Sequence, residues 1–143
     1  MFENILVPID LSNPSNQAFK ISLDLAQKYN SKVTLLTCVE GDAWHHYFYD
    51  ARADSELLKK QSKAAKKFME KLEDVAQKSG IKVKLQILKS TSVARDIATF
   101  AKSRKIDLIV MSSHGRTGLD KLILGSVANG VIQRSKTPVL LIK

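Results

Sequence analysis

The chain has 143 residues, of which 44% are apolar and 26% are charged. This length suits one domain, and this balance is that of a globular protein and not of a disordered chain. No apolar run reaches the roughly 18–20 residues of a membrane-spanning helix, and the first ten residues lack the basic flank of a signal peptide. The single Cys38 excludes an internal disulfide. We therefore expect one domain over residues 1–143, located in the cytoplasm and without membrane contact.

The positive charge is confined to the second half of the chain. Residues 1–80 carry 11 basic and 11 acidic side chains, whereas residues 81–143 carry 12 basic and 3 acidic ones, which accounts for the whole net charge of +9. A localised positive field attracts anions, such as the phosphates of a small ligand or of a nucleic acid. A solvated basic surface without a ligand is the alternative.

Strand and helix patterns alternate along the first half. A short apolar strand is predicted over residues 4–10, a helix from about Asn13 to Tyr29, and a second strand over residues 32–39. Residues 40–54 contain Trp44 and two of the three tyrosines, and we expect them to form a long surface loop or flap. A long helix over residues 55–79 follows, and Gly80 is placed as its C-terminal cap.

The same alternation continues to the end of the chain. We expect a strand over residues 82–88, a helix over 92–104, a strand over 107–113, a helix over 126–134 and a last strand over 138–142. This order predicts an α/β fold, in which helices cover both faces of an open, five-stranded, mostly parallel sheet. Ligands bind such sheets beyond the carboxyl ends of the strands, where the strand order reverses.

The loop between the fourth predicted strand and the last helix is rich in glycine. Residues 112–126, SSHGRTGLDKLILGS, contain Gly115, Gly118 and Gly125, half of the six glycines in the chain. Glycine lets backbone N–H groups converge on an anion, and Gly125 stands directly before a helix whose N-terminus favours negative charge. We expect Ser126 both to cap that helix and to donate its hydroxyl to a phosphate oxygen. Three further side chains add donors or positive charge: His114, Arg116 and Lys121.

This loop predicts phosphate binding, with a plain flexible connection as the alternative. The P-loop motif GxxxxGK[ST] is absent, and no GxGxxG follows the first strand. The loop instead resembles that of nucleotide-binding universal stress proteins, whose pattern G-x2-G-x9-G-[ST] is similar to Ser112-x2-Gly115-x9-Gly125-Ser126. The family's opening strand resembles ILVPIDLS and its closing strand resembles TPVLLIK. The resemblance extends over the whole chain.

The resemblance implies a Rossmann-like fold of the adenine nucleotide alpha-hydrolase type and a UspA-like, ATP-binding regulator of the stress response. ATP is the implied ligand, with ADP or AMP as alternatives, and Mg²⁺ would be coordinated mainly by the phosphates. Pro8 and Asp10 would lie beside the adenosine, and Val39 would meet the adenine through its backbone. The ribose and phosphates would be flanked by Met111, Ser112, His114, Gly115 and Arg116. The terminal phosphates would be held by Gly125, Ser126 and the N–H of Val127.

Three positions depart from the family's pattern. Ser112 stands in place of the first glycine of the loop, Leu11 in place of the glycine that follows the aspartate, and Ser92 in place of a glycine before the third helix. The resemblance also implies a homodimer in which strand 139–142 pairs antiparallel with its twin, since an apolar terminal edge strand needs cover. A regulator of this kind also implies a protein partner that it controls.

Other functions compete with nucleotide sensing. The chain could be a dimeric interaction protein that binds no nucleotide, or a nonspecific nucleic-acid binder, although it lacks the aromatic platform of recognition modules. His45 and His46 do not predict a metal site, because adjacent histidines point apart on regular structure. His114 could act as a general base, but no nucleophile is placed with it, so we expect no catalytic residue and at most slow ATP hydrolysis.

Overall fold

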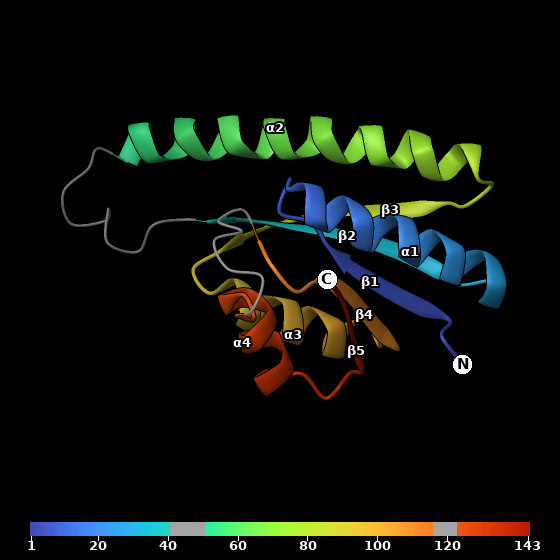
Figure 1. Ribbon diagram of the computed structural model, residues 1–143. Helices are drawn as coiled ribbons and strands as arrows, with labels where there is room; N and C mark the ends of the chain where they lie inside the picture. Colours follow the sequence, from blue (N-terminus) through green and yellow to red (C-terminus); the bar gives the residue numbers. More distant parts are fainter. Residues whose placement is uncertain (41–50, 116–122) are drawn as a thin grey trace.

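The computed structural model describes residues 1–40, 51–115 and 123–143, with the side chains of the second helix described from residue 56 onward. In these residues strands and helices alternate strictly (Figure 1). The elements are β1 (Asn4–Pro8), α1 (Asn13–Tyr29), β2 (Lys32–Glu40), α2 (Ala51–Lys78), β3 (Val83–Ser90), α3 (Val93–Ser103), β4 (Leu108–Ser112), α4 (Ser126–Arg134) and β5 (Val139–Ile142).

The five strands form one parallel sheet in the order β3-β2-β1-β4-β5. The chain moves outward from β1 through β2 to β3 and then crosses back to β4 on the other side of β1. The strand order therefore reverses between β1 and β4, whose carboxyl ends are Pro8 and Ser112. The predicted five-stranded α/β sheet is confirmed, and every pairing in it is parallel.

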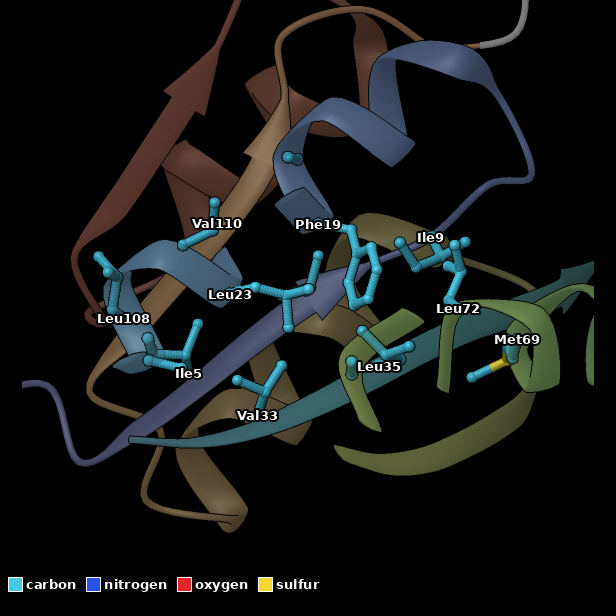
Figure 2. Packing of buried hydrophobic residues seen from close by; sticks show 14 residues of the cluster. Ile5, Ile9, Phe19, Leu23, Val33, Leu35, Met69, Leu72, Leu108 and Val110 are labelled. Atoms are coloured by element: carbon cyan, nitrogen blue, oxygen red, sulfur yellow. The ribbon is translucent and has the colours of Figure 1, made fainter. Parts of the chain in front are cut away.

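Helices cover both faces of the sheet (Figure 1). Side chains of β1 alternate between the faces: Ile5 and Val7 pack under α1 and α2, while Leu6 packs against α3 and α4. The α1–α2 layer is centred on Phe19 and Met69, which are almost fully buried (Figure 2). The strands are thus apolar on both sides, as expected for a parallel sheet covered by helices on both faces.

Local signals account for both ends of α1 and for the end of α2. The Ser12 hydroxyl caps α1 by accepting the N–H of Ser15 at 3.3 Å, and Asn30 ends this helix in the left-handed conformation with φ of 54°. Gly80 follows α2 with φ of 73°, as its predicted role as a cap requires. The predicted start of α2 at Ser55 is wrong by four residues. The helix begins at Ala51, because alanine and arginine at 51–53 are strong helix formers that extend it into the predicted loop.

No helix among the described residues is long and apolar enough to cross a lipid bilayer.

Candidate functional site

A cleft of about 490 Å³ opens at the carboxyl edge of the sheet, at the point where the strand order reverses. Its walls are the ends of β1, β2 and β4, the first turns of α3 and α4, and the face of α2 around Gln61 and Ala65. Position and volume both fit a small-molecule site of an open α/β sheet.

Asp10 is held at the β1 side of this cleft by the turn that follows it. One of its carboxylate oxygens accepts the N–H of Ser12 at 3.0 Å and also the Ser12 hydroxyl. Gly115 lies against the other oxygen: a Cβ added to Gly115 would be 3.1 Å from Asp10 Oδ2. The missing side chain at 115 therefore lets the loop after β4 approach the aspartate closely.

The residue before α4 is hydrogen-bonded to the residue that follows β4. The Gly125 N–H donates to the Ser113 carbonyl at 2.7 Å, and a Cβ on Gly125 would lie 3.0 Å from that same oxygen. The Asn129 N–H makes the first intrahelical bond, to the Gly125 carbonyl at 2.9 Å. Gly125 is the cap residue, and no side chain among the described residues caps the helix, so the prediction that Ser126 caps it is wrong.

The first N–H groups of α4 therefore lie at the wall of the cleft without an intrahelical partner. Ser126, Val127 and Ala128 all line the cleft. In contrast, α1 has its own serine cap. An uncapped helix N-terminus carries about half a positive charge and favours a bound anion.

β2 extends past its neighbour at the cleft. Its pairing with β1 ends at Leu36 opposite Pro8, whereas its pairing with β3 continues to Glu40. The edge of β2 beyond Leu36 is thus no longer covered by β1, and Val39 there lines the cleft. Such an edge offers backbone hydrogen bonds to a planar ligand, which is the role implied for Val39.

Two further side chains of β2 lie in this wall. Thr37 is 4% exposed, and its hydroxyl oxygen finds no hydrogen-bond partner in the described structure. Cys38 lines the cleft, and burial, with smaller contributions from Asp96 and Glu40, raises the pKa of its thiol to about 11. The thiol is therefore protonated and unreactive at neutral pH.

His114 is oriented by its neighbour. Its Nδ1 lies 2.8 Å from the Ser113 hydroxyl, and its Nε2 is buried without a hydrogen-bond partner in the part of the chain that the structure describes. Both residues line the cleft. A serine hydroxyl thus lies within hydrogen-bond distance of His114, which corrects the expectation that no potential nucleophile is placed with this histidine.

The three departures from the glycine pattern differ in their structural consequences. Leu11 has φ of 67°, a left-handed conformation that costs a leucine roughly 1–2 kcal/mol. Ser92 has φ of −146°, which any residue adopts, and Ser112 is a paired residue of β4 opposite Ile142. Only Leu11 therefore carries the strain that a glycine would relieve.

The structure brings most of the predicted site together. Ten of the eleven predicted residues line the cleft: Pro8, Asp10, Val39, Met111, Ser112, His114, Gly115, Gly125, Ser126 and Val127. Arg116 and Lys121 lie outside the described residues, as do His45, His46 and the larger part of the predicted flap. Within the described residues no cluster of three or more His, Cys, Asp or Glu side chains could hold a metal.

The sequence analysis missed the walls that α2 and α3 supply. Gln61, Ala64 and Ala65 of α2 and Val93 and Ile97 of α3 line the cleft. Their only sequence signal is an apolar helical face, which predicts burial and not a ligand site. Thr37 and Ser113 were within reach of sequence reasoning, because each lies within two residues of a predicted site residue.

Comparison with known proteins identifies the family. The universal stress protein family matches the chain over residues 1–143. The chain belongs to the universal stress protein family. It is similar to the universal stress protein MJ0531 of Methanocaldococcus jannaschii, with 32% identity over 145 residues that cover all of this chain and 83% of the relative.

Solved structures of this family share the fold. The universal stress protein UspA from Lactobacillus plantarum is 26% identical, with a TM-score of 0.88 over 99% of this chain and 98% of that one. The protein MJ0577 is 30% identical, with a TM-score of 0.86 over 100% of this chain and 96% of that one. The α/β architecture of this universal stress protein is therefore that of its relatives.

Proposed function

We propose that this universal stress protein binds an adenine nucleotide, ATP before ADP or AMP, and acts in the cytoplasm as a nucleotide-sensing regulator. The observation that carries the proposal is the N-terminus of α4, which no side chain of the described residues caps. Its first N–H groups, at Ser126 and Val127, have no intrahelical acceptor and lie at the wall of the cleft, beside two glycines whose missing side chains bring the backbone close. This is the chemistry of a phosphate site.

The end of the cleft at β2 suits the adenine base of a nucleotide. The uncovered edge of β2 at Val39 offers backbone groups, and Ile97 and Met111 supply apolar walls. Two proteins with the same fold but only 20–21% identity were solved in complex with cAMP and with dAMP, the latter from Archaeoglobus fulgidus. They show that this fold can accept an adenine nucleotide, and the residues of this chain supply the argument that it does.

Mg²⁺ fits the cleft only as a companion of the nucleotide. The described residues contain no cluster of metal ligands, and the Asp10 carboxylate already accepts two hydrogen bonds from Ser12. Phosphate oxygens and water would supply most ligands of the ion, as is usual for Mg²⁺. We propose that occupancy of the cleft, and not turnover of ATP, is the regulatory signal.

The test replaces Ser126 by aspartate. Ser126 is exposed in the first turn of α4, where an acid stabilises a helix by about 0.3–1 kcal/mol, so Ser126→Asp should fold normally while repelling a phosphate. Gln133→Glu is the matched control, since it adds the same charge to the same helix about 10 Å further along its axis. Thermal unfolding is followed with Mg–ATP, with Mg–AMP and without ligand.

Saturation at about 100 times the dissociation constant should stabilise the wild type and Gln133→Glu by roughly 2.7 kcal/mol. Ser126→Asp should lose most of the gain with ATP. The proposal fails if millimolar Mg–ATP leaves the melting temperature of the wild type unchanged, or if Ser126→Asp responds as strongly as the control. A dimeric interaction protein without a ligand would be the alternative in the first case.

We further propose a homodimer through β5, Val139–Ile142. This strand is an edge of the sheet, and Leu140 on it is 37% exposed. Edge strands of this kind pair with other chains unless they are protected. Light scattering should show a dimer at micromolar concentration that Leu140→Lys converts to a monomer, and a monomeric wild type would refute the pairing.

A further inference from the structure

A second, larger groove lies at the opposite edge of the sheet from the nucleotide cleft. Its volume is about 990 Å³, and it runs along α3 to the segments that precede β1, β4 and β5. Phe2, Ile106 and Pro138 line it, each within two residues of the start of a strand. The groove is therefore at the amino ends of the strands, far from Ser126 and Asp10.

The rim of this groove is strongly basic. Five cationic side chains line it: Arg95, Lys102, Lys105, Arg134 and Lys136. Asp107 is the one acid among the described residues of the lining, and its carboxylate accepts the N–H of Asn4 at 2.8 Å. Arg95 is partly neutralised by Asp96 at 3.2 Å. Lys102, Lys105 and Lys136 form no ion pair within the described part of the chain.

The floor of the groove is apolar. Ala101 and Ile106 are buried in it, and Phe2, Ala98 and Pro138 add further apolar lining, beside the two threonines Thr99 and Thr137. Phe2, the aromatic side chain that the described lining contains, contacts Tyr29 edge-on, with ring centroids 5.6 Å apart. One such ring provides no platform for the successive bases that a single-stranded nucleic acid stacks on aromatic side chains.

We propose that this groove docks an acidic protein segment with interspersed apolar side chains, and that it is the surface through which a regulated partner binds. The partner's carboxylates would meet Lys102, Lys105 and Lys136, and its apolar side chains would lie on the floor between them. Charge complementarity of this kind sets partner choice and association rate. The inference goes beyond nucleotide binding and does not depend on it.

The position of the groove allows a nucleotide and a partner to bind together. α3 and α4 lie side by side on one face of the sheet (Figure 1), and they pack at Gly130 and Ala94. The first turns of both helices line the nucleotide cleft, while Lys102 and Arg134, near their last turns, line the groove. The same two helices therefore contact both sites.

The experiment measures fluorescence anisotropy of a short labelled peptide rich in glutamate and leucine, at physiological ionic strength. Its glutamine counterpart and a short labelled oligouridylate are measured in parallel. The test variant is Lys102→Glu with Lys136→Glu, two exposed positions of the rim. The matched control is Lys63→Glu with Lys66→Glu, two exposed positions of α2 outside the groove. Thermal unfolding checks that both variants fold.

We expect the glutamate peptide to bind the wild type at least about tenfold more tightly than the glutamine peptide, and the rim variant to weaken that binding at least about tenfold. The control should stay within about twofold of the wild type. Three results overturn the proposal: no binding of the glutamate peptide at millimolar protein, equal weakening in rim and control variants, or oligouridylate binding as tight and as rim-dependent as that of the peptide.

Discussion

Replacing Gly130 by alanine should destabilise this protein, although the same change stabilises most helices. Gly130 is buried in α4 where this helix contacts α3, and a Cβ at this position would lie 2.6 Å from the Cβ of Ala94. Carbon atoms in contact are separated by about 3.5–4.0 Å. Because the Ala94 methyl is fixed to the backbone of α3, the two helices would have to separate by about 1 Å.

The magnitude follows from two opposing terms. Alanine in place of glycine in a helix interior contributes about 1 kcal/mol of stability. Overpacking a buried contact costs about 1–3 kcal/mol, and a clash with a fixed methyl group belongs at the upper end of that range. We therefore expect Gly130→Ala to lower the free energy of unfolding by about 2 kcal/mol, or the melting temperature by roughly 4–8 °C.

The assay is urea unfolding of the wild type, Gly130→Ala, Ala94→Gly and the double variant. Ala94→Gly removes the methyl group that clashes and leaves the gain in helix propensity, so the double variant should be about 3 kcal/mol more stable than the sum of the single effects. If Gly130→Ala is as stable as the wild type, or if the two changes are additive, the close contact of α3 and α4 is not as described.

Three smaller predictions use the same measurements or simple chemistry. Thr37→Val keeps the shape of the side chain but removes a buried hydroxyl without a partner in the described structure, so urea unfolding should show a gain of about 1 kcal/mol, and a loss would mean that the hydroxyl is satisfied. A Cβ at Gly80 would have no atom within 4 Å, so Gly80→Ala is strained only by the φ of 73° at this residue. The change should lower the free energy of unfolding by about 1 kcal/mol, and a neutral result would argue against the left-handed cap. The pKa of Cys38 is raised from 9.0 to about 11, so at pH 8 its thiolate fraction should be about a hundredfold lower than that of an unperturbed cysteine. Its rate of alkylation should therefore rise with each pH unit up to about pH 11. A rate at pH 8 equal to that of a free thiol would contradict this.

Local sequence determined the elements. The alternation of apolar strands with amphipathic helices predicted the parallel sheet, and the start of α4 at Ser126 follows from Gly125 before it. Gly80 marked the end of α2 because few other residues tolerate a left-handed φ. These signals involve neighbours along the chain, so they are visible without a structure. The start of α2 was missed where helix-forming residues adjoined an aromatic segment without a clear stop.

The need for glycine at a position has either a local cause or a cause in the tertiary structure. The family pattern treated Leu11, Ser92 and Ser112 alike, but only Leu11 has a left-handed backbone. A glycine is required by a positive φ or by a close approach of another atom, and the second cause depends on distant residues. Gly115 approaches Asp10 and Gly130 approaches Ala94, contacts that join segments far apart in the chain.

The sequence by itself therefore determined the order of the elements, the fold class and the loop residues that line the cleft, because these depend on periodicity and on one contiguous loop. The tertiary structure alone decided that α2 and α3 complete the walls of the cleft and that, among the described residues, no side chain caps the start of α4 there. It also gathered five cations from α3, α4 and the segments that follow them around a second groove. Such sites arise from packing between helices, and no local sequence pattern predicts which helix faces will pack against one another.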